Sequence, residues 1–230
     1  MNVGRVMLSP HRSVVPSDGS RAVSVAHDHG GFGPYTAEDL HAREDEGRGL
    51  ELEDGWLIEM SPSAPHNWVA MQLGELLKTA GAEADVFVAV GGEWEISTPA
   101  GIRKPDLFMV PKGVAHASIV NRSPVIIPGG ELLLVVEVIS PGGASERTDR
   151  VRKLREYAVL GIPQYWMVEF TPRPRVHVFT LGGDDPACPP AGASGYRLDR
   201  TIEGGQPVDA KIEAARPFTV RFDPRKLIEF

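Results

Sequence analysis

The stretch LLLVVEVISP, residues 132–141, places one carboxylate in an otherwise apolar run. Glu137 is flanked on both sides by valine and isoleucine, so the segment is expected to form a strand that lies deep in a core. Burial of an ionisable acid costs free energy unless the acid is paired, neutralised or bound to a metal. The environment of Glu137 therefore bears directly on what this chain does.

Composition limits the class of protein. The chain has 230 residues, which fits one large domain or a domain with appendages, and 42% of them are hydrophobic. The net charge of −7 argues against a generally basic protein that coats nucleic acid, although a local basic patch is allowed. Cys188 is the only cysteine, which excludes an internal disulfide and a multi-cysteine zinc site. Apolar runs fall short of the ~20 residues of a membrane helix. We expect a soluble, cytoplasmic protein that does not enter a membrane.

The order of elements predicts one mixed α/β domain around a central sheet. Residues 1–34 lack periodicity and are expected to be a flexible leader, followed by a single domain over 35–230 with a flexible connector near 182–195. The expected elements are a helix after Thr36, a hairpin turning at Asp54-Gly55, a helix from His66 to Gly81, a hairpin over 86–97 turning at Gly91-Gly92, a strand over 102–111, a loop over 111–130, the apolar strand, a helix over 146–160, and strands at 164–170, 175–181, 196–202 and 218–222.

Two acids occupy strand positions where packing alone does not require them. Asp106 stands at the mouth of an apolar strand, and Glu137 lies within the next one. Two carboxylates on neighbouring strands can converge on one hard divalent cation, because Mg²⁺ prefers oxygen ligands. The alternatives are that Glu137 pairs with an arginine, or that its strand is an exposed edge.

A lysine follows on the expected helix over 146–160. Asp149, Lys153 and Tyr157 recur at intervals of four and form one stripe beside the apolar face of that helix. A lysine there could reach inward with its long stem. The alternative is a solvated Asp149–Lys153 pair.

The ordered set of these motifs resembles the bacterial Uma-two family of restriction endonucleases, within the PD-(D/E)XK nuclease superfamily. The similarity spans about residues 35 to 180. The matching pieces are Glu51-Leu52 with Asp54-Gly55, Met60-Ser61-Pro62 with His66, Arg103 with Pro105-Asp106, Val136-Glu137-Val138-Ile139-Ser140-Pro141, and finally Asp149, Lys153, Tyr157, Gly161 and Gln164-Tyr165-Trp166-Met167-Val168.

The resemblance implies a restriction-endonuclease-like fold, a mixed β-sheet flanked by helices. It also implies an Mg²⁺-dependent endonuclease that hydrolyses DNA, with Mn²⁺ able to substitute. Asp106 and Glu137 would be metal ligands, with the Val138 carbonyl as a third. The superfamily usually carries a lysine two residues after the glutamate, where this chain has Ile139, so Lys153 would take over the role of activating water.

The resemblance leaves the roles of two further residues, Glu51 and His66, open. Glu51 would support the metal indirectly, with an exposed hairpin acid as the alternative. For His66, a structural or capping role stands beside a catalytic one. Basic residues between Arg147 and Arg155, together with Arg103 and Lys104, would place positive charge where phosphates approach.

Two other functions remain open from the sequence. Ile139 in place of the usual lysine would also suit a catalytically silent protein- or nucleic-acid-binding module of the same fold. A hydrolase of small phosphoesters would use the same acids in a closed pocket. A homodimer is a further expectation, because two sites related by a two-fold axis cut both strands of a duplex most simply.

Overall fold

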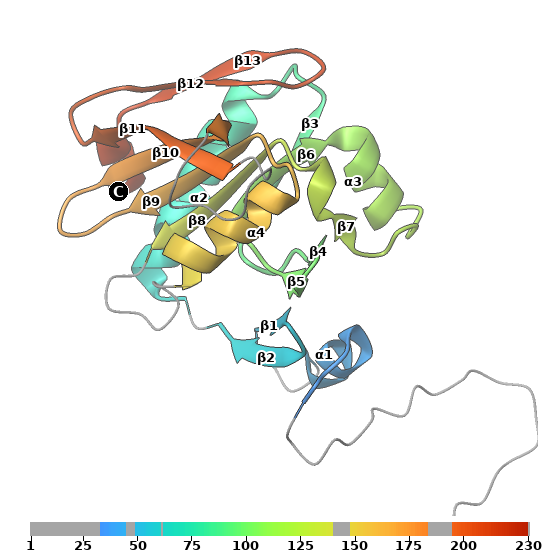
Figure 1. Ribbon diagram of the computed structural model, residues 1–230. Helices are drawn as coiled ribbons and strands as arrows, with labels where there is room; N and C mark the ends of the chain where they lie inside the picture. The colour runs from blue at the N-terminus through green and yellow to red at the C-terminus, as the bar shows by residue number, and fades with distance from the viewer. Residues whose placement is uncertain (1–32, 45–48, 61, 140–147, 184–194, 230) are drawn as a thin grey trace, which may run out of the picture.

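The computed structural model describes residues 33–44, 49–60, 62–139, 148–183 and 195–229 (Figure 1). The expected leader over 1–34 lies almost entirely outside the described residues, as does most of the expected connector over 182–195. No helix in the described ranges is long and apolar enough to cross a membrane.

A six-stranded mixed sheet forms the centre of the fold (Figure 1). Its strand order is β11-β10-β9-β8-β6-β3. The strands are β3 (Val86–Val90), β6 (Leu107–Pro111), β8 (Leu134–Ile139), β9 (Gln164–Glu169), β10 (Arg175–Gly183) and β11 (Gly195–Glu203). Neighbours are antiparallel except β8 and β9, which run parallel. The predicted β8 is an inner strand of this sheet, not an exposed edge.

Two smaller sheets complete the strands. One is five-stranded, in the order β2-β1-β5-β4-β7, and the other is the pair β12-β13. Their strands are β1 (Leu50–Glu53), β2 (Trp56–Glu59), β4 (Ile96–Thr98), β5 (Gly101–Arg103), β7 (Ile127–Pro128), β12 (Val208–Ile212) and β13 (Phe218–Phe222). The hairpin of β1 and β2 turns at Asp54 and Gly55, both with positive φ, as the sequence predicts.

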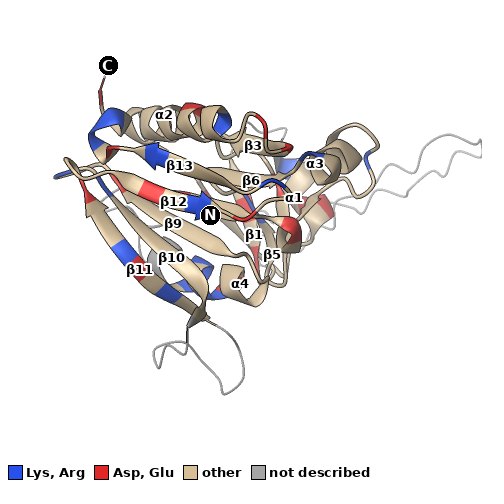
Figure 2. Ribbon diagram, turned by 90° about the horizontal axis from the view of Figure 1, so that it is seen from above, with Lys and Arg blue, Asp and Glu red and all other residues tan. Residues whose placement is uncertain are grey.

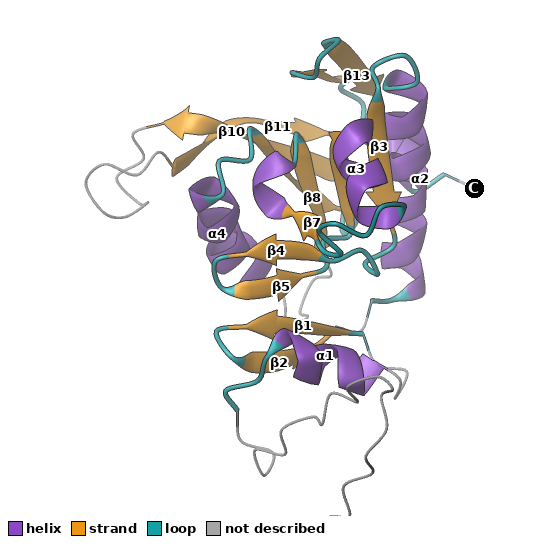
Figure 3. Cartoon of the chain, turned by 90° about the vertical axis from the view of Figure 1, so that its right-hand side faces the viewer, coloured by secondary structure: helices purple, strands orange, loops and turns teal. Residues whose placement is uncertain are grey.

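Helices cover both faces of the central sheet (Figures 1 and 3). α2 (Ala64–Ala80) lies on one face and α4 (Leu154–Val159) on the other (Figure 2). The other helical segments are α1 (Ala37–Glu44), which packs against the five-stranded sheet, α3 (Lys112–Ile119), the π-helical η2 (Thr148–Lys153) and the 3₁₀ turns η1 (Gly129–Glu131) and η3 (Pro224–Leu227). Even-numbered residues of β8 such as Val136 pack in one core with α2, whereas Val135 and Ile139 pack in another with α4. This alternation confirms the predicted sheet flanked by helices.

The predicted hairpin over 86–97 is wrong. Its two strands, β3 and β4, belong to different sheets: β3 pairs with β6 and β4 pairs with β5. Gly91 and Gly92 adopt positive φ and turn the chain out of the central sheet. The Gly91 N–H is bonded to the Asp106 carbonyl (3.0 Å) at the same point. A glycine pair marks a turn, but it does not say which strand will be the partner.

The predicted loop over 111–130 is also wrong, because it contains α3 and the short strand β7. Pro111 precedes the first residue of α3, where a proline does not interrupt helical hydrogen bonds. Pro124 and Pro128 come after the helix ends at Ile119. The three prolines therefore delimit regular structure instead of excluding it.

The predicted helix over 146–160 is observed in a different form. Residues 146 and 147 lie outside the described ranges, the next six residues are π-helical, and α-helical geometry begins at Leu154. In the tail, the strands over 196–202 and 218–222 are confirmed as β11 and β13, whereas β12 was not predicted.

Gly101 offers a test of the junction between β1 and β5. It has φ +141°, and a Cβ atom there would lie 2.4 Å from the Leu52 carbonyl oxygen. We expect Gly101→Ala to lower the free energy of unfolding, measured by urea denaturation, by about 1–3 kcal/mol more than Gly91→Ala. Gly91 is the matched control, because it also has positive φ (+109°) but nothing within 4 Å of an added Cβ. Equal losses would show that strain, and not the close approach of β1, sets the cost.

Candidate active site

Asp106 lies immediately before β6, and both of its carboxylate oxygens are held. Oδ2 accepts a hydrogen bond from the backbone N–H of Val138 (2.7 Å), and Oδ1 lies 2.8 Å from Nε2 of His66. The side chains of Asp106 and His66 are 10% and 9% exposed. The acid is thereby fixed between β8 and the first turn of α2.

Glu137 lies on β8, next to the residue that binds Asp106. Leu107 of β6 pairs with Val136 of β8, so the continuing antiparallel register sets Asp106 opposite Glu137. The Glu137 side chain is on the face of β8 shared by Val135 and Ile139. The structure thus brings the two predicted acids close together, because the Asp106 carboxylate is bonded to the N–H of Val138, the residue after Glu137.

Two donors from the helical segment after β8 contact Glu137. The Tyr157 hydroxyl donates a hydrogen bond to Oε1 (2.8 Å), and Nζ of Lys153 lies 3.2 Å from the same oxygen. Burial raises the pKa of Tyr157 well above its usual value, and the negative charges of Glu137 and Glu51 raise it further. Tyr157 therefore remains a protonated donor. These contacts give Glu137 a lysine and a tyrosine as partners.

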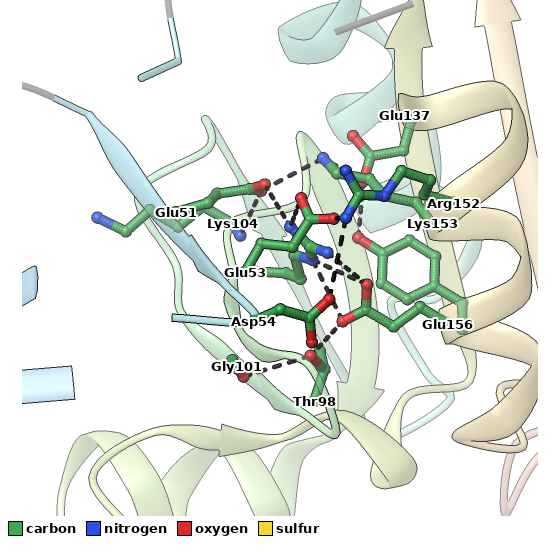
Figure 4. A network of polar contacts seen from close by, with 12 residues as sticks. Glu51, Glu53, Asp54, Thr98, Gly101, Lys104, Glu137, Arg152, Lys153 and Glu156 are labelled. Atoms are coloured by element: carbon green, nitrogen blue, oxygen red, sulfur yellow. Dashed lines mark hydrogen bonds and ion pairs between the residues drawn. The ribbon is translucent and has the colours of Figure 1, made fainter. Parts of the chain in front are cut away.

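Lys153 connects Glu137 to a second buried acid, Glu51 (Figure 4). Its Nζ lies 3.2 Å from Oε1 of Glu51, and Lys153, Glu51 and Glu137 are each 1% exposed. The backbone N–H of Lys104 also donates to that Glu51 oxygen (2.9 Å). Two alternatives are therefore wrong: Lys153 is not in a solvated pair, and Glu51 is not an exposed hairpin acid.

A second cluster, centred on Arg103, adjoins these residues through Glu51. Two of its acids, Glu53 and Glu156, are labelled in Figure 4. Nη1 of Arg103 lies 2.9 Å from Glu53 and 3.4 Å from Glu51, whereas Nη2 and Nε bind Glu156 of α4 at 2.6 and 3.0 Å. Burial opposes the charge on Arg103, but the hydrogen bonds and charge of Glu156, with that of Glu51, raise its pKa overall. The guanidinium therefore joins β1, β5 and α4.

The cluster corrects one expectation about charge. Arg103 and Lys104 are 1% and 2% exposed, so they do not present positive charge to an approaching phosphate. Arg152 is exposed and contacts Glu53 and Asp54 through Nη2. Arg155 is exposed, and the side chains of Arg147 and Arg150 lie outside the described set. The basic segment is thus divided between a buried lysine, a paired arginine and an exposed one.

The described side chains around Lys153 and Arg103 carry an excess of negative charge. Four carboxylates, Glu51, Glu53, Glu137 and Glu156, contact three cations, Arg103, Arg152 and Lys153. Asp106 adds a further acid beside them. An acidic excess at buried positions favours a cationic ligand.

No group of three or more His, Cys, Asp or Glu side chains arranged to hold a metal occurs in the part of the chain that the structure describes. Asp106 and Glu137 are two carboxylates, and the sequence assigned the third ligand to a backbone oxygen, that of Val138. The roles of Asp106, Glu137, Val138, Lys153 and Glu51 stay predictions.

Comparison with known proteins places this arrangement in a family. The family model Uma2, described as "Putative restriction endonuclease", matches residues 37–206. This chain belongs to the Uma2 family. The matched span includes both acids, Lys153 and the Arg103 cluster. Comparison with curated proteins finds no match.

A solved structure supports the fold. A crystal structure described as a putative nuclease belonging to DUF820 from Anabaena variabilis ATCC 29413 is similar, with a TM-score of 0.50 and 14% sequence identity. The similarity covers 78% of this chain and 89% of that one. The architecture of this Uma2 chain is therefore the restriction-endonuclease-like one that the sequence predicted.

Sequence reasoning missed several residues of the site, namely Glu53, Arg103 as an ion-pair centre, Glu156, and the contact of His66 with Asp106. One signal was present: Glu51 and Glu53 alternate with leucines in a strand, which places both acids on one face. Both are buried, so that face is not the solvated one. The distant partners Arg103 and Glu156 carry no such pattern.

Arg103 provides a test of the cluster. Replacement by methionine would leave Glu51, Glu53 and Glu156 without their shared cation, so Arg103→Met should lower the free energy of unfolding in urea by about 3–5 kcal/mol. Arg221→Met is the control, because Arg221 forms an exposed pair with Asp209 (2.9 Å) and its loss should cost about 0–1 kcal/mol. A loss at Arg103 no larger than at Arg221 would contradict a central role for the guanidinium.

Proposed function

We propose that this protein is a metal-dependent endonuclease that hydrolyses DNA phosphodiester bonds, with Mg²⁺ as its ion and Mn²⁺ able to replace it. The observation that carries the proposal is the meeting of three groups: Asp106, bonded to the Val138 N–H directly after Glu137 (2.7 Å), Glu137 itself, and the Lys153 amine 3.2 Å from Glu137. Membership of the Uma2 family supports it.

The donor set fits a hard divalent ion. Asp106 and Glu137 offer carboxylate oxygens, and the Val138 carbonyl follows directly in the chain. Each Asp106 oxygen has one hydrogen-bond contact with described residues, and a carboxylate oxygen can accept two. Mg²⁺ needs few protein oxygens, because it keeps several of its waters. Asp106, Glu137 and the Val138 carbonyl would therefore hold the ion.

Residues of this chain would perform the rest of the reaction. When bound, a divalent ion supplies a Lewis acid that offsets charge developing on the phosphate. The Lys153 ammonium group lies beside the Glu137 carboxylate, where it can hold the attacking water and offset negative charge on the phosphate. Glu51 and Tyr157 fix Lys153 and Glu137 through the contacts described above. In this proposal Glu51 acts through the lysine and does not touch the phosphate.

One observation favours a second candidate function. The Lys153 ammonium already pairs with both Glu51 and Glu137 at 3.2 Å, so these acids have a cationic partner within the chain itself. A catalytically silent protein- or nucleic-acid-binding module could retain such a pairing as part of its core. The two functions differ in whether DNA is cut and whether the cutting depends on Asp106.

Cleavage of supercoiled plasmid tests the proposal. With Mg²⁺ or Mn²⁺, the purified full chain should nick or cut the plasmid, and Asp106→Asn, Glu137→Gln and Lys153→Met should each reduce the rate by about 10²-fold or more. Lys78→Met is the matched control, because Lys78 lies on α2 in an exposed pair with Glu75 (2.9 Å). Cleavage that persists in all three variants would refute the assignment of the site. No cleavage by the unaltered protein would favour the silent module.

Glu51→Gln separates a supporting role from a ligand role. The variant keeps the size of the side chain but removes the charge that faces Lys153, so we expect a slower maximal cleavage rate with little change in the Mn²⁺ concentration needed for half of that rate. The rate should be followed at increasing Mn²⁺. A large rise in the required Mn²⁺ with an unchanged maximal rate would instead make Glu51 a ligand.

The expected homodimer stays a separate prediction, tested by light scattering of the purified chain.

A further inference from the structure

His66 contacts Asp106 through its side chain and is not among the proposed metal ligands. Its Nε2 lies 2.8 Å from Oδ1 of Asp106, and both side chains are about nine-tenths buried. An ionised carboxylate only accepts hydrogen bonds, so Nε2 must carry the hydrogen in this contact. His66 therefore donates to one oxygen of Asp106 while the Val138 N–H donates to the other.

Local sequence holds His66 in place. Ser63 is the N-cap of α2, and its side chain accepts a hydrogen bond from the His66 backbone N–H (3.4 Å). Pro65 occupies the first turn, where its fixed φ suits a helix start. Farther along, Val69, Leu73 and Leu77 of α2 are buried in the core that contains Val136 and Val138 of β8. The imidazole thus stands on a rigid element packed against the strand that carries Glu137.

The two donors restrict Asp106 differently. The Val138 N–H fixes Oδ2 relative to β8, but a single contact leaves the carboxylate able to rotate about its bond to Cβ. The His66 contact at Oδ1 removes that rotation, because the second donor comes from a different element. A carboxylate held at both oxygens keeps one orientation before any ion arrives, which lowers the ordering cost of binding.

We propose that His66 is a positioning residue that sets the orientation of Asp106 for a divalent cation. The inference rests on the proposed function, since it assigns Asp106 as a ligand. It gives His66 a role beyond opening α2, and the role depends on a donor at the Nε2 position and not on the imidazole as such. Partners of this kind typically change metal affinity by about 10–100-fold when they are removed.

A pair of amide substitutions separates this role from simple packing. His66→Gln can place an amide donor near the position of Nε2, whereas the shorter side chain of His66→Asn stops closer to the backbone. Both amides are polar and uncharged and differ in the reach of their donor, and the thermal unfolding of each variant shows how much packing it has lost. His116→Asn is the matched control, because His116 is exposed on α3.

The measurement is Mn²⁺ binding to the full chain by isothermal titration calorimetry, with Asp106→Asn to show that the heat comes from this site. Thermal unfolding identifies variants that are folded. We expect His66→Asn to weaken Mn²⁺ binding by about 10–100-fold, and both His66→Gln and His116→Asn to bind nearly as the unaltered protein does. In cleavage assays, His66→Asn should require more Mn²⁺ but approach the normal rate at saturation.

The outcomes distinguish this inference from the proposed function. Binding that depends on Asp106 but is equally tight in His66→Asn would overturn the positioning role and leave the metal site standing. Equal weakening by folded Gln and Asn variants would overturn the role of the donor. Absence of Mn²⁺ binding to the unaltered protein would overturn both the metal site and the inference that depends on it.

Discussion

The contact of one buried lysine with two buried glutamates is the constraint on which the site depends. Glu51 belongs to the five-stranded sheet and Glu137 to the central one, and the Lys153 amine lies 3.2 Å from each. Two carboxylates without water repel each other strongly, so the ammonium between them is what permits this approach of the two sheets. Buried ion pairs of this kind add little to stability compared with apolar residues of similar volume. Stability alone therefore does not account for the arrangement, which the proposed role of Lys153 beside Glu137 would explain.

Arg103 is a second buried cation that holds several carboxylates together. Its guanidinium binds Glu156 on one side and Glu53 and Glu51 on the other, so the element that carries Lys153 is tied to the hairpin that carries Glu51. Arginine suits this position because its planar donors can face several carboxylates at once. Lys153 and Arg103 are thus linked through Glu51, and a change at Arg103 would be felt at Glu51 without any direct contact with the acids on the central sheet.

Local patterns predicted much of the fold but less of the site. The apolar run around Glu137, the Asp54-Gly55 turn and the helix expected from His66 to Gly81 each carry their signal within a few residues, and all three elements were found. The partner of β3 was not predictable, because pairing depends on which distant strand lies alongside. The same limit applies to Arg103 with Glu156 and to His66 with Asp106, which are 53 and 40 residues apart. Sequence spacing identified charged residues in buried elements, but only the fold determines which of them meet.

The place of Lys153 follows from the geometry of the helix that carries it. Ile139 lies on the same face of β8 as Glu137, two residues after it, where the superfamily usually carries its lysine. Its side chain is fully buried among apolar residues that include Met167. Lys153 is the last residue of the π-helical η2 and precedes the first residue of α4, Leu154, so Lys153 and Tyr157 lie about one helical turn apart on the same side. Lys153 and Tyr157 therefore both reach the same oxygen of Glu137. The six residues that end at Lys153 are π-helical. The helix thus changes its geometry at the residue whose amine must reach the sheet, and two successive turns then fix one carboxylate from the same side.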